Sequence, residues 1–238
     1  MSAPMLTSAE QRSAARQLTL AMLALGLLVL GLVWRWLAPD QSGVSQLLLG
    51  VASLLVAVPV MAAVAGVIAL TDGRPILFRQ RRVTRDGRLF TLVKFRTMTN
   101  MHDADGHLLP DAARTTPVGR ALRAVRLDEL PQLWHILTGD MALIGPRPLL
   151  PETIVAAGKT GQARCAVRPG LTGWAQVNGN TLLSDADKMA LDLWYIDHRS
   201  LSLDINILWR TVLVALTGER TDPASIRRAY ESGARWRS

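Results

Sequence analysis

The interpretation of this chain starts from the stretch Arg123-Ala124-Val125-Arg126-Leu127-Asp128-Glu129-Leu130-Pro131-Gln132-Leu133-Trp134. Two adjacent carboxylates, Asp128 and Glu129, precede an apolar pattern at positions 130, 133, 134 and 137, which is the spacing of one helix face. Pro131 suits the first turn of a helix, because its missing N–H costs nothing there. Taken alone, the stretch fits an ordinary helix start, since the helix dipole favours acids at the N-terminus. A reactive carboxylate pair is the alternative.

The composition limits the kinds of partner. The chain has 238 residues, of which 49% are hydrophobic and 5% aromatic, so its apolar content is mostly aliphatic. The formal net charge of +8 favours an anionic partner such as nucleic acid, lipid headgroups or phosphorylated small molecules. Cys165 is the only cysteine, which excludes an internal disulfide and is compatible with a reducing compartment.

Two apolar stretches near the N-terminus indicate membrane segments. Residues 18–38 form a run that exceeds the apolar part of a cleaved signal peptide, so a membrane helix is favoured. Residues 47–70 carry no charge, and Pro59 stands in their middle. Because proline removes a backbone hydrogen bond, this second helix either spans the membrane with a kink or bends and returns to the side it entered. Composition alone favours spanning.

A basic cluster follows the second apolar stretch. Its six arginines fall within fifteen residues: Arg74, Arg79, Arg81, Arg82, Arg85 and Arg88. A basic cluster beside a membrane segment marks the cytoplasmic side and attracts anionic lipid. The cluster lacks interleaved aromatics, so we predict no nucleic-acid partner. Residues 76–78 and 89–93 have strand-like composition around an Asp86-Gly87 turn, which predicts a hairpin.

Residues 100–117 read as a polar loop beside the substrate entrance. His102, Asp103, Asp105 and His107 lie in it, but their spacing matches no firm metal-ligand pattern, so a solvated loop is favoured over a metal site. Further along, two prolines bracket Arg147 in Gly145-Pro146-Arg147-Pro148. This pattern fits either a rigid surface turn or a pre-organised anion clamp, since arginine grips phosphate through two parallel hydrogen bonds.

The C-terminal third combines turns and helices. Residues 167–179 are turn-rich with a short strand, and residues 186–197 are helix-like. Residues 200–216 form an apolar segment that fits a core helix or a helix in the membrane interface, and the nearby Trp194, Tyr195 and Trp209 favour the interface. The tail at 217–238 is basic and expected to be loosely ordered.

Five stretches, in order, resemble the bacterial sugar transferases known as monotopic polyprenyl-phosphate phosphoglycosyl transferases. They are Phe78-Arg79-Gln80, Lys94-Phe95-Arg96-Thr97-Met98, Leu127-Asp128-Glu129-Leu130-Pro131-Gln132-Leu133, Gly145-Pro146-Arg147-Pro148 and Gly173-Trp174-Ala175-Gln176-Val177-Asn178-Gly179. The resemblance covers residues 55–216, and the order of five motifs makes it far more specific than any single one.

The resemblance implies a reaction and a place in the cell. The family moves a sugar phosphate from a nucleotide diphosphate sugar, usually a UDP-sugar, onto a polyprenyl (undecaprenyl) phosphate and releases UMP. This step starts the synthesis of exopolysaccharide, capsule, O-antigen or glycans. The implied location is the bacterial inner membrane, with the catalytic domain facing the cytoplasm. The implied partners are a UDP-sugar, polyprenyl phosphate and membrane lipids, and a homo-oligomer is left open.

The resemblance also assigns roles to residues of this chain. Asp128 would be the nucleophile, with Glu129 as its partner, and a magnesium ion would lie near Asp128. The substrate-binding positions are Lys94, Arg96, Arg123, Arg147 and Gln176. Pro59 matches a proline that breaks a re-entrant membrane helix, which raises the returning path above the spanning one. Two positions depart from the family pattern: Val58 stands where serine is frequent, and Asn180 stands where arginine is common.

The expected fold is α+β: a membrane-anchored, re-entrant helix with a small mixed α/β catalytic domain. The expected divisions are residues 1–46 with a candidate membrane helix at 18–38, a helix at 47–70 broken at Pro59, a catalytic domain at 71–216 and a basic tail at 217–238. A small sheet is expected from residues 76–94 and 167–177. Two other functions use the same features: a membrane-tethered, Mg²⁺-dependent lipid-phosphate phosphatase, and a non-catalytic protein that binds anionic lipid.

Overall fold

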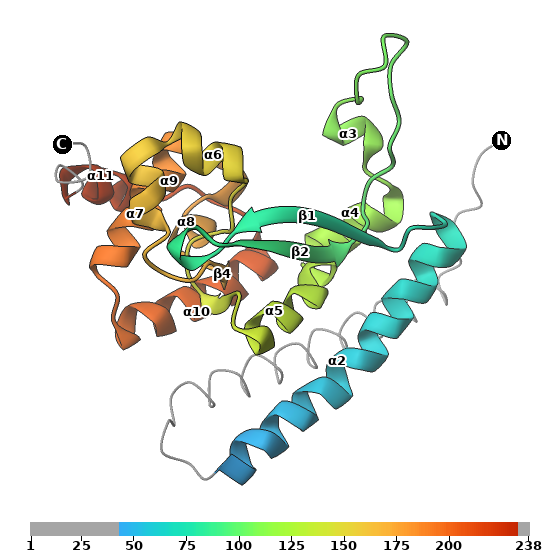
Figure 1. The fold of residues 1–238 in the computed structure, drawn as a ribbon, viewed down its shortest axis with the longest axis horizontal. Helices are drawn as coiled ribbons and strands as arrows, with labels where there is room; N and C mark the ends of the chain where they lie inside the picture. The colour runs from blue at the N-terminus through green and yellow to red at the C-terminus, as the bar shows by residue number, and fades with distance from the viewer. Residues whose placement is uncertain (1–42, 233–238) are drawn as a thin grey trace. The chain divides into compact units, whose positions relative to one another are not determined.

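The computed structural model describes the backbone of residues 43–232 and the side chains of residues 57–232 (Figure 1). The candidate membrane helix at 18–38 and the last residues of the tail therefore lie outside the described residues. The chain divides into two units, Met1–Arg74 and Pro75–Ser238.

The described part of the first unit is one long helix, α2 (Gly43–Thr71), followed by a short connection. The helix continues through Pro59, where the sequence predicted a sharp bend. A proline removes one hydrogen bond, and the turns on either side can carry the helix past it. Gly73 closes the helix at φ +73°, and its amide bonds to the carbonyl of Ile68. Within the described residues, no helix combines the length and apolarity that crossing a bilayer requires. The re-entrant path therefore stays a prediction.

The second unit begins with the predicted hairpin, and the structure confirms it. Strands β1 (Leu77–Val83) and β2 (Leu89–Phe95) are antiparallel, with Leu77 opposite Phe95 and Val83 opposite Leu89. The turn is a short 3₁₀ segment, η1 (Arg85–Gly87), in which Asp86 has a φ of +60°. Both strands are longer than expected. The backbone pairing continues through the arginine positions of β1 and extends over the full length of β2.

A second, separate sheet consists of β3 (Ala142–Ile144) and β4 (Gly170–Thr172), which are parallel. The sequence placed residues 167–177 in the same sheet as the hairpin, and this was wrong. Gly145 explains the pairing, since a Cβ on it would meet the backbone of Arg168 and Gly170. The missing side chain lets the two strands approach closely.

The helices of the second unit lie on either side of β3 and β4 along the chain (Figure 1). Before β3 lie α3 (Asp111–Arg114), α4 (Pro117–Ala124), the 3₁₀ helix η2 (Leu127–Gln132) and α5 (Leu133–Thr138). Between β3 and β4 lie α6 (Pro151–Ala156) and α7 (Gly158–Arg164). After β4 come α8 (Trp174–Val177), η3 (Asn180–Leu182), α9 (Asp185–Asp197), α10 (Leu201–Thr217) and α11 (Pro223–Ser232).

The main core forms where α8, α9, α10 and α11 meet. Its buried side chains include Trp174, Leu191, Tyr195, Ile207 and Ala229. The Tyr195 hydroxyl donates to a carboxylate oxygen of Asp204 at 2.8 Å, which satisfies both polar groups inside the core. Because α11 contributes to this core, the expectation of a loosely ordered tail was wrong for residues 223–232.

The dyad segment differs from the single helix that its spacing predicted. It is a 3₁₀ helix with Pro131 inside it, followed by an α-helix. A 3₁₀ helix has three residues per turn, so the change of period moves the apolar positions onto different faces. Leu130 is buried, whereas Trp134 and Leu137 are exposed. The expected apolar face therefore splits into a buried part and an exposed part.

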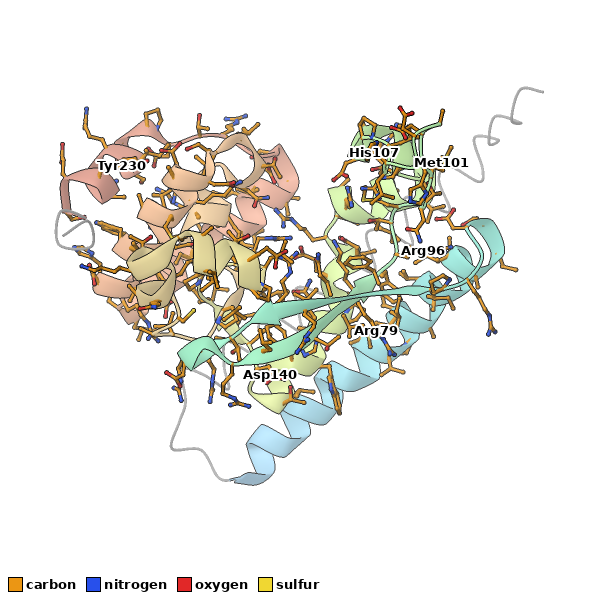
Figure 2. The ribbon with its side chains drawn as sticks, turned by 45° about the horizontal axis from the view of Figure 1, so that its top comes forward. Arg79, Arg96, Met101, His107, Asp140 and Tyr230 are labelled. Atoms are coloured by element: carbon orange, nitrogen blue, oxygen red, sulfur yellow. The ribbon has the colours of Figure 1, made fainter. Side chains whose placement is uncertain are left out.

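Between β2 and α4 the chain leaves the body of the unit (Figure 1). This projecting segment, residues 98–115, is closed at its base by a bridge between Met98 and Thr115. Figure 2 shows Met101 and His107 on it. The Asp103 carboxylate accepts hydrogen bonds from the amides of Asp105 and His107, at 3.0 and 2.8 Å. These contacts form a local turn.

Candidate active site

The centre of the candidate site is the Asp128–Glu129 pair, which lies in the first turn of η2. Both residues are buried, with 5% and 8% of their surfaces exposed. Two adjacent buried carboxylates are costly unless cations or hydrogen bonds compensate their charge. The structure supplies such cations from several elements.

Arg147 and Arg126 both approach Glu129. The Nη2 atom of Arg147 donates to Glu129 Oε1 at 3.0 Å. The Nη1 atom of Arg126 lies 3.8 Å from Glu129 Oε2. Each oxygen of Glu129 thus faces one guanidinium, and these positive charges offset the cost of burying the carboxylate.

Asp128 has a different environment. Burial raises the pKa of Asp128, and the neighbouring Glu129 charge raises it further, while Lys94, Arg123 and Arg126 act in the opposite direction. Burial lowers the pKa of Lys94, and Asp128 partly restores it. Glu129 is paired with two guanidinium groups, whereas burial raises the pKa of Asp128, so the two carboxylates have different surroundings, as expected at a reactive centre.

The motif at residues 94–98 holds Arg123. Its Nε donates to Thr97 Oγ1 at 2.9 Å, and its Nη2 lies 2.8 Å from Met98 Sδ. Gly119 of α4 packs directly on Thr97, because a Cβ on Gly119 would meet the Thr97 carbonyl. Sequence reasoning identified Lys94 and Arg96 as the cations of this motif, but it missed the positioning contact of Thr97. A contact between a threonine and an arginine of another element produces no recognisable pattern in the local sequence.

The turn at Arg147 is held at three successive carbonyls. The Pro146 carbonyl accepts from the amide of Gly170 at 2.8 Å. The Arg147 carbonyl accepts from Arg164 Nη2, and the Pro148 carbonyl accepts from Arg82 Nη1 at 3.2 Å. The prolines fix the dihedral angles, and these bonds fix the position of the turn in the fold. The backbone position of Arg147 is therefore set before any ligand binds, and from this position its side chain reaches Glu129.

A buried ion pair supports this turn. Arg164 Nε and Nη2 contact Asp192 Oδ2 at 2.8 and 2.7 Å, and both residues are almost fully buried. Burial raises the pKa of Asp192, while the charge and hydrogen bonds of Arg164 lower it. Sequence reasoning missed this pair because its members are 28 positions apart, on α7 and α9. It also assigned Arg82 to a lipid-binding cluster, whereas its guanidinium faces the turn.

Two further predicted site residues, Gln176 and Arg96, lie on other elements. Gln176 is buried, and its Nε2 donates to the Leu171 carbonyl at 3.1 Å, while its Oε1 has no hydrogen-bond partner among the described residues. A substrate-binding role for Gln176 therefore stays a prediction. Arg96 is half-buried at the end of β2, where its amide bonds to the carbonyl of Ile76. Figure 2 shows Arg96 at the end of the hairpin toward the projecting segment. The structure thus gathers Lys94, Arg123 and Arg147 with the dyad.

The donor set of the dyad fits a magnesium ion. Mg²⁺ prefers oxygen ligands, and it is usually bound by one or two carboxylates with substrate phosphates and water. Asp128 supplies one buried carboxylate, whereas both oxygens of Glu129 face guanidinium groups. Among residues 57–232, no group of three acidic, histidine or cysteine side chains forms a complete metal cage. A magnesium ion held by Asp128 would therefore need further oxygen ligands from a phosphate-bearing substrate and from water.

Comparison with known proteins agrees with this geometry. The family model described as "Bacterial sugar transferase" matches residues 42–218. An uncharacterized sugar transferase, EpsL, of Bacillus subtilis (strain 168) is 46% identical over 153 residues, which are 64% of this chain and 76% of that protein. The undecaprenyl-phosphate glucose phosphotransferase of Komagataeibacter xylinus is 40% identical over 173 residues, 67% of this chain and 32% of that protein.

A third relative is the UDP-glucose:undecaprenyl-phosphate glucose-1-phosphate transferase of Escherichia coli (strain K12). It is 36% identical over 188 residues, which are 72% of this chain and 40% of that protein. This chain thus spans well under half the length of the two relatives named for their substrates. The match extends over most of the chain and includes the dyad, the Arg147 turn and the segment around α8. The chain belongs to the bacterial sugar transferase family, enzymes of the phosphoglycosyl transferase kind.

Proposed function

We propose that this enzyme transfers a sugar 1-phosphate from a UDP-sugar to undecaprenyl phosphate and releases UMP, as the first step of exopolysaccharide or related glycan synthesis. The observation that carries the proposal is the buried Asp128–Glu129 pair, in which Arg147 and Arg126 face Glu129 while burial raises the pKa of Asp128. The names of two relatives support the undecaprenyl phosphate acceptor, and one also names UDP-glucose as the donor.

The reaction proceeds in two displacements. In the first, an Asp128 oxygen attacks the phosphorus that bears the sugar, and the bond from that phosphorus to the UMP oxygen breaks. In the second, a phosphate oxygen of the lipid attacks the same phosphorus, and the Asp128 carboxylate leaves with its bonding electrons. A carboxylate with a raised pKa is a better nucleophile than an ordinary one, provided that it is ionised when it attacks.

The cations around the dyad offset the negative charge of the diphosphate. Lys94, Arg123 and Arg147 bring positive charge to the dyad from β2, α4 and the Arg147 turn. Without them, the phosphate oxygens would repel the attacking carboxylate. Asp128 would hold a magnesium ion, which neutralises phosphate charge when it is bound. The positioning bonds from Thr97 and Arg164 keep two of the arginines in place before the donor arrives.

A location at the cytoplasmic face of the inner membrane is part of the proposal. Helix α10 exposes large apolar side chains along one side: Leu201, Ile205, Trp209, Val212, Leu213 and Leu216. Spacings of three and four residues place them on one face, as in a helix that lies in a membrane interface. Such a surface would bring the dyad to a lipid that stays in the bilayer. The hairpin adds exposed arginines, including Arg79, which Figure 2 shows on it.

The location is tested by labelling in intact cells. Arg81→Cys in a Cys165→Ser background places one thiol on the hairpin, where Arg81 is exposed. We expect no reaction with a membrane-impermeant thiol reagent until the cells are opened. Labelling of the intact cells would contradict the cytoplasmic orientation.

The reaction is tested with the purified full chain in detergent. The enzyme is mixed with Mg²⁺ and each of a panel of UDP-sugars, with and without undecaprenyl phosphate, and UMP is measured. We expect catalytic UMP release with one donor or a few, and only when the lipid is present. Release of inorganic phosphate from undecaprenyl phosphate in the absence of any UDP-sugar would indicate a lipid-phosphate phosphatase. Failure to release UMP with every donor would favour a protein that only binds anionic lipid.

A further inference from the structure

Glu219 lies just beyond the end of α10, yet its carboxylate contacts the surroundings of the dyad. Its Oε1 accepts from Asn180 Nδ2 at 2.5 Å and lies 3.3 Å from Arg126 Nη2. Its Oε2 accepts from the Thr181 amide at 3.2 Å and from the Thr181 hydroxyl. Four donors fill the hydrogen-bonding capacity of this carboxylate. It is therefore suited to hold its neighbours rather than to receive a ligand.

The backbone around Glu219 is unusual. In the described part of the chain, three residues other than glycine have a positive φ: Asp86, Arg126 and Asn180. Two of them, Arg126 at +59° and Asn180 at +44°, contact Glu219. Such conformations persist when the surrounding structure enforces them, and they cluster at functional sites.

Glu219 is held in its ionised form. Burial would raise its pKa, but hydrogen bonds from Thr181 and Asn180 and the charge of Arg126 hold the pKa below its ordinary value. The ionised carboxylate attracts the guanidinium of Arg126, and only 24% of the Glu219 side chain is exposed to solvent. A partly buried pair of this kind is screened less than one at the surface.

Arg126 is shared between two carboxylates. One of its terminal nitrogens lies 3.3 Å from Glu219 and the other lies 3.8 Å from Glu129. The position of this guanidinium therefore sets how much positive charge reaches the dyad. If Glu219 were neutral, Arg126 would be free to leave its left-handed conformation or to pair fully with Glu129.

We propose that Glu219 is a positioning residue of the active site, which holds Arg126 between Glu219 and Glu129 from 93 positions further along the chain. This inference rests on the proposed function, since its effect is on the chemical step at the dyad. Glu219 does not touch the reacting atoms. It acts through Arg126, so its loss alters the turnover of bound substrate more than the binding of the donor.

A double-mutant cycle on the purified full chain tests this inference. Its variants are Glu219→Gln, Arg126→Gln and the two combined, each assayed for UMP release with the donor that the wild-type enzyme accepts. The amide introduced by Glu219→Gln would keep an acceptor for Thr181 but lose the charge that attracts Arg126. Glu231→Gln is the matched control, because Glu231 is an exposed acid of α11 that pairs only loosely with Arg227, at 3.9 Å.

We expect Glu219→Gln to lower kcat by about tenfold to a hundredfold, the range that a small misplacement near a reacting centre can cause. The KM for the UDP-sugar and the melting temperature should change little. The double variant should lose no more kcat than Arg126→Gln alone, because the two residues act as one unit. Glu231→Gln should match the wild type.

Three results would overturn the inference. A Glu219→Gln enzyme with normal kcat would do so, even if its melting temperature fell, because that pattern indicates a purely structural contact. Losses that multiply in the double variant would show that Glu219 does not act through Arg126. A rise in KM with unchanged kcat would place Glu219 in donor binding. If the wild type itself released no UMP, the proposed function would fail instead.

Discussion

The dyad and the projecting segment both carry closely spaced acidic side chains, but their surroundings differ. Asp128 and Glu129 are buried, and arginines from other elements face them. Asp103 and Asp105 are exposed, and Asp103 uses its carboxylate to close a turn within its own loop. The closeness of two acidic residues in the sequence therefore does not identify a reactive pair. Burial with cations from distant parts of the chain is what distinguishes a reactive pair from solvated ones.

The largest expected effect comes from removing the carboxylate of Asp128. Asp128→Asn keeps the size of the side chain but cannot form a phosphate ester on a carboxylate oxygen. We expect turnover to fall by about 10⁴-fold or more, as for the loss of other enzymatic nucleophiles. UMP release by the purified variant is the measurement. Asp111→Asn, which changes an exposed residue of α3, is the matched control.

If Asp128 merely capped its helix, the outcome would be different. The Asp128→Asn variant would then lose about 0.5–2 kcal/mol of stability and keep most of its turnover. A correctly folded variant with near-native turnover would therefore favour the structural interpretation and remove the contrast with Asp103.

The ion pair between Arg164 and Asp192 should matter most for stability. Asp192→Asn leaves the buried guanidinium of Arg164 without its counter-charge, which typically costs about 3–5 kcal/mol. We expect a clear fall in the unfolding midpoint of the purified protein. The exposed pair between Arg114 and Asp111, also at 2.7 Å, is the comparison. Asp111→Asn should change stability by no more than about 1 kcal/mol.

The Arg147→Lys variant tests whether the site needs the planar guanidinium of Arg147 or only its positive charge. Lysine keeps the positive charge but loses the planar group that donates to Glu129 at 3.0 Å. We expect kcat to fall by about 10²-fold, the cost of losing one well-placed donor at a reacting centre. Near-native turnover of this variant, measured by UMP release, would show that bulk charge is sufficient.

The smallest effect is expected in the projecting segment. Asp103→Asn retains an oxygen that can accept from the amides of Asp105 and His107. We expect stability to change by no more than about 0.5 kcal/mol, as for most surface substitutions. Turnover should stay at the wild-type value. A large loss of turnover would show that this segment takes part in the reaction, and the contrast between the two acidic clusters would then be wrong.

The sequence predicted the parts of the site that depend on local patterns. The hairpin followed from a turn between two apolar strands, and Arg147 followed from its two bracketing prolines. Asp128 and Glu129 were identified from the motif that contains them. The structure brings Lys94, Arg123 and Arg147 together with this pair, as the resemblance implied.

The contacts that were missed are long-range. Arg164 meets Asp192 across 28 positions, and Arg126 meets Glu219 across 93 positions. The periodic patterns that predict helices and strands do not reveal such a pair, because each partner looks like an ordinary charged residue in its own helix or turn. The exposure of Trp134 was missed for another reason. A 3₁₀ turn at Pro131 changes the helical period, and the apolar spacing gave no sign of it.

The central claim is that Asp128 carries the phospho-sugar during the reaction. The most direct test mixes the enzyme with Mg²⁺ and its UDP-sugar in the absence of lipid, and then measures the mass of the intact protein. The account predicts an added mass of one sugar phosphate, located at Asp128 by fragmentation, together with UMP in an amount limited to the enzyme present. Adding undecaprenyl phosphate should remove the added mass. An unmodified protein that nevertheless turns over with lipid would contradict the account.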